Sequence, residues 1–329
     1  MSDAALPLPP LPPRDPAGHK GTFGTVAIVG GCATPATRMI GAPALAALAA
    51  LRAGAGLARL VMPAPILDAG LTITPSATGR PLPTDATGAV IPHEAAAVID
   101  ELAHSCTCLA IGPGLGRGDG PRAAALRAVQ QDAVPVIVDA DAINALAEIP
   151  QLTRDLRAAA VLTPHPGEFK RLTQSMGLRD DLGLDRSREA AAESLAQRLG
   201  CIVVLKGRGT VVSDGVRTWT ATTGNAALAT AGTGDVLTGL IAGLVAQFVA
   251  PPPPPGLPDA VRARFPRPPG RPLDLFDAVR LAVHAHGLAA DRWTAARSAS
   301  AGLLAGELAD ALPATLETLR SPPAPPGDR

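Results

Sequence analysis

The chain has 329 residues, of which 47% are hydrophobic, and its 29 basic and 29 acidic residues give a formal net charge of zero. This length suits one large α/β domain or two smaller ones, and the balanced charge argues against a general nucleic-acid-binding protein. Aromatic residues make up only 2% and tyrosine is absent, so the core must be built from Ala, Val, Leu and Ile.

Proline-rich segments mark the ends of the predicted domain. Residues 1–17 are predicted to be disordered and lack the apolar core of a signal peptide, and four cysteines without a C-x-x-C pair favour reduced thiols, so a cytoplasmic location is expected. Residues 251–272 are predicted to be an inserted loop and residues 313–329 a disordered tail. One domain is therefore expected over residues 18–312.

Short apolar runs alternate with Ala-rich helical segments along this domain. Near-continuously apolar strands that alternate with helices indicate an α/β fold, with a mostly parallel sheet covered by helices on both faces. Residues 210–216 contain an Asp-Gly turn and predict a hairpin that adds an antiparallel portion. The apolar runs are Val26–Val29, Leu109–Ile111, Val134–Val138, Ala160–Leu162 and Ile202–Leu205.

Unusual residues directly follow each apolar run. Open α/β sheets bind ligands at the carboxyl ends of their strands, so we expect these residues to share one crevice. They are Gly30-Gly31, Gly112 to Gly116, Asp139 to Asp141, Thr163 to Glu168, and Lys206 to Gly209.

Each of these motifs has a structural alternative. The glycines from Gly112 to Gly116 allow a substrate to approach the backbone, but they also fit a strand-to-helix turn. Lys206 to Thr210 offers cationic donors for a phosphate, or forms a tight turn with solvated charges. Asp139 and Asp141 either bind Mg²⁺ that carries a nucleotide or cap the following helix.

Three histidines receive separate interpretations. His165 lies between two prolines on a stiff loop, where Glu168 would orient the loop or a bound metal, although a rigid turn without function explains the same residues. His284 and His286 lie two residues apart on a predicted helix and face different sides of it, so we interpret them as packing residues.

Gly232-Thr233-Gly234-Asp235 is the most informative stretch. A glycine turn that opens a buried helix directs free N–H groups at one point, which suits a phosphate or an oxyanion. An acid beside that point is reasonable if it removes a proton while the N–H groups hold negative charge. The alternative is an acid that only interacts favourably with the helix dipole.

The motifs occur in an order that resembles the ADP- or ATP-dependent NAD(P)H-hydrate dehydratases, over residues 18–312; His19-Lys20-Gly21 and Gly41-Ala42-Pro43 add to the match. The resemblance implies a ribokinase-like three-layer fold. It implies repair of the S-epimer of hydrated NADH and NADPH with ADP or ATP as co-substrate and Mg²⁺ as counter-ion. AMP or ADP and phosphate would be released. The family is often fused to an epimerase domain, and a stand-alone dehydratase domain is expected here.

The resemblance also implies roles for individual residues. Asp235 would take the hydroxyl proton, and the N–H groups of Thr233, Gly234 and Asp235 would stabilise the transferring phosphoryl group. The family's nucleotide-binding positions match Lys206, Gly207, Arg208, Gly209, Thr210 and Gly234. Its substrate-binding positions match Ala42, Gly114, Gly116, His165 and Asp235, and the metal ligands are left unassigned.

Two other functions compete with this interpretation. A small-molecule kinase of the same superfamily, acting on a vitamin-precursor alcohol, would share the Gly232-to-Asp235 motif, but the loop from Thr163 to Glu168 and the His19-Lys20-Gly21 start favour the dehydratase. A non-catalytic nucleotide-binding protein would leave Asp235 idle. The chain departs from the family at Cys32, where a serine is usual. We expect ADP rather than ATP as co-substrate, a homo-oligomer such as a tetramer, and no nucleic-acid or membrane partner.

Overall fold

The computed structural model describes residues 6–178, 187–250 and 271–320. Within them, one sheet has the strands β1 (Thr25–Val29), β4 (Leu57–Pro63), β5 (Thr78–Leu82), β6 (Cys108–Ile111), β7 (Val136–Val138), β8 (Ala160–Leu162), β9 (Ile202–Leu205), β10 (Val211–Ser213) and β11 (Thr218–Thr220). Their order is β11-β10-β9-β8-β7-β6-β1-β4-β5. Pairing is parallel from β5 to β9 and antiparallel at β10 and β11, which confirms the predicted sheet and hairpin.

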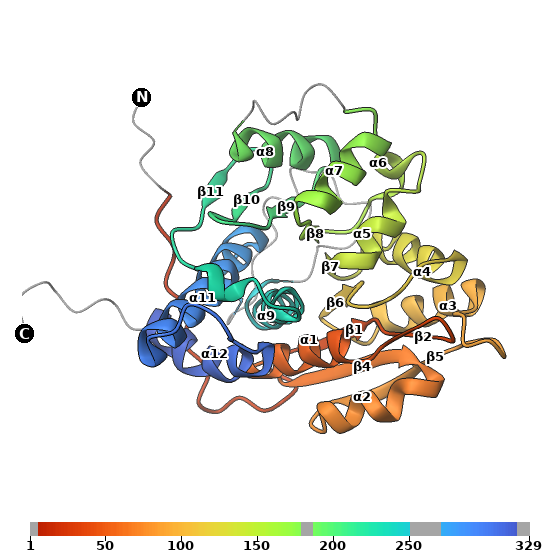
Figure 1. Cartoon of the computed structure of the whole chain (residues 1–329), viewed down its shortest axis with the longest axis horizontal. Helices are drawn as coiled ribbons and strands as arrows, with labels where there is room; N and C mark the ends of the chain where they lie inside the picture. The colour runs from red at the N-terminus through yellow and green to blue at the C-terminus, as the bar shows by residue number, and fades with distance from the viewer. Residues whose placement is uncertain (1–5, 179–186, 251–270, 321–329) are drawn as a thin grey trace, which may run out of the picture.

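The sheet lies between two layers of helices, which confirms the three-layer prediction (Figure 1). On β1, Val26 and Ile28 face one core, while Ala27 and Val29 face the other. The first core is completed by α1 (Gly41–Arg52), α2 (Leu67–Ile73), α9 (Thr233–Phe248), α11 (Leu275–Arg297) and α12 (Ala305–Arg320). The second is completed by α3 (Pro92–Ala103), α4 (Asp119–Gln130), α5 (Ala140–Leu146), α6 (Leu152–Asp155), α7 (Pro166–Ser175) and α8 (Arg188–Leu199).

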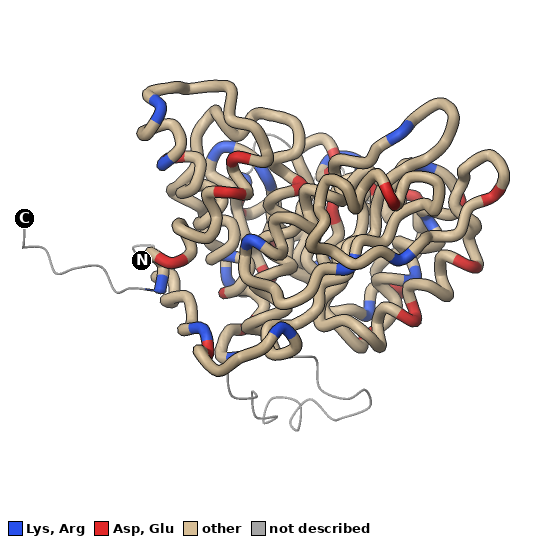
Figure 2. The backbone as a smooth tube through the Cα atoms, turned by 90° about the horizontal axis from the view of Figure 1, so that it is seen from below, with Lys and Arg blue, Asp and Glu red and all other residues tan. Residues whose placement is uncertain are grey.

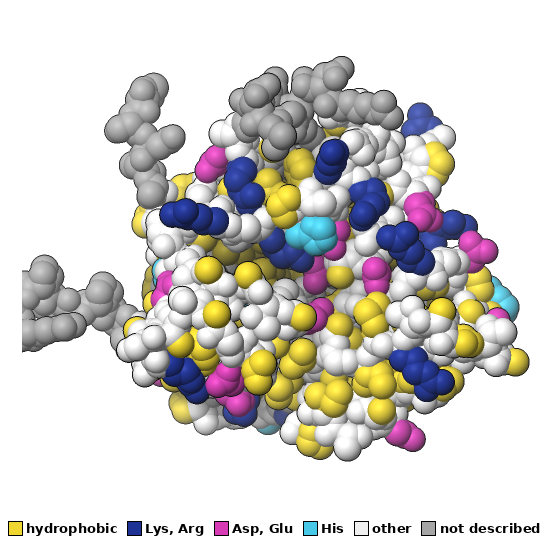
Figure 3. Space-filling view, in the orientation of Figure 1, with side chains coloured by type: hydrophobic (Ala, Val, Ile, Leu, Met, Phe, Trp, Pro, Cys, Tyr) yellow, Lys and Arg dark blue, Asp and Glu magenta, His cyan; other side chains and the backbone are white. Residues whose placement is uncertain are grey.

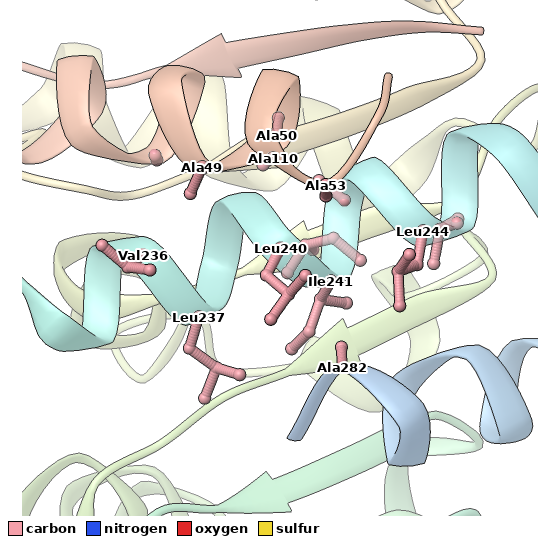
Figure 4. Packing of buried hydrophobic residues seen from close by; sticks show 14 of the residues in the cluster. Ala49, Ala50, Ala53, Ala110, Val236, Leu237, Leu240, Ile241, Leu244 and Ala282 are labelled. Carbon is pink, nitrogen blue, oxygen red and sulfur yellow. The ribbon is translucent and has the colours of Figure 1, made fainter. Parts of the chain in front are cut away.

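Helix α9 is the most enclosed helix of the first layer, with every residue from Val236 to Phe248 buried. It packs between α1 and α11 and against the sheet through small and aliphatic side chains (Figure 4). The contact with α1 is close because Gly239 has no side chain: a Cβ there would lie 1.9 Å from the carbonyl oxygen of Ala46. The alanine-rich core expected from the composition thus fixes the position of α9.

The strand order reverses beside β1, since β4 and β5 are added on one side of it and β6 to β9 on the other. Open α/β sheets form their ligand crevice at such a point. The loops that leave β1 and β6 meet there: the Gly31 amide donates to the Pro113 carbonyl at 3.0 Å, and a Cβ on Gly30 would lie 2.2 Å from the same oxygen. The small hairpin of β2 (Cys32–Thr34) and β3 (Thr37–Met39) follows at the same edge.

The predictions for the two ends of the chain are wrong in part. Helix α12 continues to Arg320, because Leu312, Thr315 and Leu316 are buried on it, so residues 313–320 are helical. The described part of the predicted N-terminal segment, residues 6–17, packs beside α12 at Leu11, which is 2% exposed and whose amide donates to the Leu319 carbonyl. Buried leucines anchor both segments despite the proline content on which the prediction of disorder was based. Residues 1–5, 251–270 and 321–329, including most of the predicted loop at 251–272, lie outside the described residues.

Charged residues of both signs are interspersed along the backbone, as the zero net charge suggests (Figure 2). Among the described helices, none is long and apolar enough to cross a bilayer.

Candidate active site

The loops after β7, β8 and β9 converge on the first turn of α9. Lys206, which follows β9, places its Nζ 2.7 Å from Oδ1 of Asp139 after β7, and 4.0 Å from Oε2 of Glu168 at the start of α7. A Cβ on Gly234 would lie 3.7 Å from the same Nζ. The predicted convergence at the strand ends is therefore present, with the lysine beside the helix that carries Asp235.

A cavity of ≈ 600 Å³ opens on one side of this point. The cavity is large enough for a small-molecule ligand. The loop 221–229 and the face of α11 that carries Val283 and His286 complete its wall. In Figure 3, histidine, basic and acidic side chains gather near the middle of the molecular face. Every residue predicted to bind the nucleotide lines this cavity: Lys206, Gly207, Arg208, Gly209, Thr210 and Gly234.

The residues predicted to bind the hydrate lie outside the lining of this cavity. Ala42 and Gly114 are neighbours, since a Cβ on Gly114 would lie 3.3 Å from the Cβ of Ala42. The Gly116 amide donates to Oδ2 of Asp141 at 2.9 Å, and Asp141 in turn acts electrostatically on Asp235. The predicted hydrate-binding residues are thus linked in parts, Ala42 with Gly114 and Gly116 through Asp141 with Asp235, and the first turn of α9 carries both Gly234 of the cavity and Asp235.

His165 is the N-cap of α7. Its Nδ1 accepts hydrogen bonds from the amides of Gly167 and Glu168, and Oε2 of Glu168 accepts one from the His165 amide, which makes a reciprocal capping box. The alternative of a rigid turn is therefore part of the explanation for this motif. The side chain remains 55% exposed, and its Nε2 lies 3.3 Å from Oε1 of Glu168, so a ligand would meet the ring together with this carboxylate.

Asp235 is the third residue of α9 and is largely buried. Burial raises the pKa of Asp235 to about 7; the charges of Asp139 and Asp141 add to the rise, and Lys206 opposes it. A carboxyl group with a pKa near neutral is well matched to accept a proton at physiological pH.

The backbone geometry at the start of α9 is suited to an anion. Gly232 is the N-cap with φ of 91°, a left-handed conformation that glycine adopts without strain, and it has no side chain to cap the helix. The amides of Gly234 and Asp235 belong to the first turn, which has no intrahelical acceptors. The Thr233 amide instead points to the Thr230 carbonyl at 3.4 Å, so this structure gives Thr233 a smaller share in the anion hole than the sequence predicts.

His286 has a role that sequence reasoning missed. Its ring is buried against α9, with Nε2 at 2.8 Å from the Thr233 carbonyl, and it lines the cavity. Burial lowers the pKa of His286 to about 4, so the neutral ring donates its Nε2–H to that carbonyl. The interpretation as a packing residue is correct for its burial but omits this hydrogen bond, which depends on how α11 faces α9 and has no local signal in the sequence.

The structure bears on whether Asp139 caps a helix and on which residues could hold a metal ion. Asp139 precedes α5 but does not cap it through its side chain. Among the described residues, no three His, Cys, Asp or Glu side chains are grouped to hold a metal ion. Mg²⁺ is usually held by one or two carboxylates together with phosphates and water, so such an ion does not require three ligands from the chain.

Comparison with known proteins decides the family. The sequence profile of the NAD(P)H-hydrate dehydratases matches residues 26–314. The chain belongs to this family. It is 36% identical over 278 residues to the bifunctional NAD(P)H-hydrate repair enzyme of Salinibacter ruber, which covers 83% of this chain and 45% of that protein. The corresponding enzyme of Moorella thermoacetica is 35% identical, with 85% and 48% covered. The chain thus spans about half the length of these relatives.

Solved structures agree with the fold. The ADP/ATP-dependent NAD(P)H-hydrate dehydratase of Bacillus subtilis, co-crystallised with ATP and Mg²⁺, is 31% identical with a TM-score of 0.68, over 94% of this chain and 95% of that chain. A ribokinase-like superfamily protein of Enterococcus faecalis has a TM-score of 0.72 at 22% identity, over 95% and 93%. The latter likeness concerns the fold alone, and it confirms the ribokinase-like prediction.

Proposed function

We propose that this chain uses ADP or ATP to dehydrate the S-epimer of hydrated NADH and NADPH, and so restores the reduced dinucleotides. One observation carries the proposal: Asp235, whose pKa burial raises to about 7, directly follows the cavity-lining Gly234 in the first turn of α9 and interacts with Asp141, which accepts a hydrogen bond from Gly116. The family membership supports the substrate, and the raised pKa of Asp235 beside the free amides of the first helical turn supports its proposed role as the base.

The proposed reaction begins with transfer of the terminal phosphoryl group of the nucleotide to the hydroxyl of the hydrate. Asp235 accepts the hydroxyl proton while the new P–O bond forms and the phosphoanhydride P–O bond breaks. Phosphate then leaves with the C–O bonding electrons, a neighbouring C–H gives its proton to solvent, and the electrons of that C–H bond form the returning ring double bond. Because phosphate is a better leaving group than water, a kinase-like fold can perform a dehydration.

The residues divide between the two ligands in this proposal. Lys206 and the glycine loop to Thr210 hold the nucleotide, and Lys206 with the amides of Gly234 and Asp235 neutralises charge on the transferring group. Ala42, Gly114, Gly116 and His165 hold the hydrate. Mg²⁺ accompanies the nucleotide phosphates and offsets their charge, as the ATP/Mg²⁺ complex of the Bacillus subtilis relative suggests.

The purified chain, mixed with hydrated NADH and Mg²⁺, is expected to restore the near-ultraviolet absorbance of NADH when a nucleotide is added. We propose ADP as the preferred co-substrate, so parallel reactions with ADP and ATP test this preference. No recovery with either nucleotide would contradict the proposed function.

Phosphorylation of a vitamin-precursor alcohol in place of dehydration would establish the kinase alternative. Light scattering on the same sample tests the proposed homo-oligomer.

The rate of dehydration is expected to rise with pH through the neutral range. Asp235 must be ionised to accept a proton, so kcat/KM should fall about tenfold for each pH unit below about 7 and level off above it. Initial rates from pH 5.5 to 9 measure this limb in the free enzyme. A profile that is flat down to pH 5.5 would show that the group has an ordinary carboxyl pKa or is not the base.

A further inference from the structure

Asp139 occupies an unusual position for a carboxylate. It follows β7 and is only 1% exposed. Its oxygens accept hydrogen bonds from Oγ1 of Thr163 at 2.7 Å, from Nζ of Lys206 at 2.7 Å and from Oγ1 of Thr238 at 2.8 Å. The three donors come from the ends of β8 and β9 and from the second turn of α9. One buried side chain therefore joins three strand ends to the helix that carries the base.

Asp139 is held in its ionised form. Burial by itself would raise its pKa, but Lys206 and the three hydrogen bonds bring the pKa of Asp139 below the ordinary value. The partner responds in the matching direction: burial would lower the pKa of Lys206, whereas Asp139 and Glu168 raise it. The two groups thus form a charged ion pair, in which each holds the other inside the site.

Three carboxylates act on this one ammonium group: Asp139 at 2.7 Å, Glu168 at 4.0 Å, and Asp235 through its charge. Lys206 lies next to Gly234 and interacts electrostatically with Asp235, but its hydrogen bond goes to Asp139. If Lys206 paired with Asp235 instead, the carboxylate would be a weaker proton acceptor and the lysine would be drawn away from the phosphate. The hydrogen bonds from Thr163 and Thr238 hold Asp139 in the geometry that prevents this exchange.

We propose that Asp139 is a positioning residue of the dehydration, which holds Lys206 beside the first turn of α9 and keeps it from pairing with Asp235. The lysine then meets the nucleotide phosphate while Asp235 stays free to accept the proton. This inference rests on the proposed function for its consequence in catalysis, but the pairing itself is independent of it. The titratable and charged groups around Asp235 and Lys206 include Asp139, Asp141, His165, Glu168, His286 and Arg188, whose Nη2 donates to the Lys206 carbonyl at 3.1 Å.

The test is Asp139→Asn, which keeps the shape of the side chain and removes its charge. Removing the negative neighbour and freeing Lys206 both favour ionised Asp235, so the midpoint of the rising pH limb of kcat/KM should move down by about one unit or more. We expect kcat to fall at least about tenfold, because Lys206 is displaced and the base is weaker. The comparison variant Thr238→Val removes one of the hydrogen bonds that hold Asp139 without changing its charge, so its midpoint should move down much less than that of Asp139→Asn.

A second readout does not need turnover. The pKa of Asp235 can be measured from stability: the wild type and Asp235→Asn are unfolded at a series of pH values, and the difference between their unfolding free energies is followed against pH. The same comparison between Asp139→Asn and the double variant reports the pKa of Asp235 without the Asp139 charge. With Asp139 present, the difference in unfolding free energy should grow as the pH rises to about 7 and then stay constant. With Asp139→Asn, the difference should become constant at a lower pH. If the wild type repairs no hydrate, the proposed function fails while this cycle still tests the pairing.

An unchanged midpoint in both readouts would overturn the proposal. Circular dichroism shows whether Asp139→Asn folds; if it does not, Asp139→Ser repeats the test with a smaller hydroxyl side chain. Failure of both variants to fold would assign Asp139 to folding rather than to positioning, and would also overturn the proposal. A midpoint that moves equally in Thr238→Val would show that hydrogen bonding, not the charge of Asp139, controls the base.

Discussion

Replacing Asp235 by asparagine is expected to lower kcat by about 10²- to 10⁴-fold while the affinity for the nucleotide changes little. A carboxamide cannot take up the hydroxyl proton, but the backbone amides of the first turn of α9 and the Lys206 side chain are unchanged. Recovery of NADH absorbance measures kcat, and calorimetric titration with ADP measures affinity. A variant with wild-type turnover would show that Asp235 is not the base.

The same substitution should stabilise the protein at alkaline pH. Because the folded-state pKa of Asp235, about 7, lies above the ordinary value of 3.8, ionisation weakens the folded state as the pH rises from about 4 to about 7. Asparagine does not ionise, so at pH 8 the free energy of unfolding of the variant should exceed that of the wild type by about 1–2 kcal/mol, a figure discounted for the partial exposure of Asp235. At pH 4 the two free energies should be almost equal. Urea unfolding at both pH values measures the difference.

The matched control for both effects is Asp310→Asn. Asp310 is 62% exposed and pairs with Arg52 on the surface of the α1–α12 contact. Exposed ion pairs contribute little, so this variant should keep the wild-type rate and gain no stability at pH 8. Loss of activity and gain of stability in Asp235→Asn alone would identify a residue whose environment serves the reaction at the expense of folding.

The part of the site that lies at strand ends was predictable from the sequence. Asp139, Glu168 and Lys206 follow three different strands, yet the rule that parallel strands present their carboxyl ends at one edge predicts that they meet, and they do. The partnership of Asp139 with Thr238 was not predictable, because it depends on which turn of α9 faces β7. The hydrogen bond from His286 to the Thr233 carbonyl was not predictable either, because it depends on how α11 faces α9.

The edge strand β5 and its inner neighbour β4 were not predicted from the sequence. β5 reads Thr-Gly-Arg-Pro-Leu and is buried only at Leu82, so it lacks the apolar run by which the central strands were recognised. β4 contains Arg59 within an otherwise apolar segment. An edge strand has one neighbour and a more exposed face, which permits polar residues and proline, and pattern-based prediction is weakest there.

Gly239→Ala is expected to destabilise the protein, although the same change in most helices is stabilising. Alanine gains about 1 kcal/mol over glycine in helix propensity. At this position, however, its Cβ would lie 1.9 Å from the Ala46 carbonyl oxygen and 2.7 Å from the carbonyl carbon, which is backbone of α1 and has no rotamer to yield. Overpacking of this kind costs about 3 kcal/mol, which leaves a net loss of about 2 kcal/mol and a fall in Tm of about 4–8 °C.

Gly306→Ala is the control, since it makes the same chemical change near the start of α12, where a Cβ would meet no atom within 4 Å. This variant should be stabilised by about 0.5–1 kcal/mol. Opposite signs for the two variants in thermal unfolding would show that contact with α1, not helix propensity, governs residue 239; equal signs would contradict the close approach of the two helices. Since Gly239 lies one turn beyond Asp235, the α1–α9 contact also determines where the base stands, and the surviving folded fraction of Gly239→Ala should show a reduced kcat that Gly306→Ala does not share.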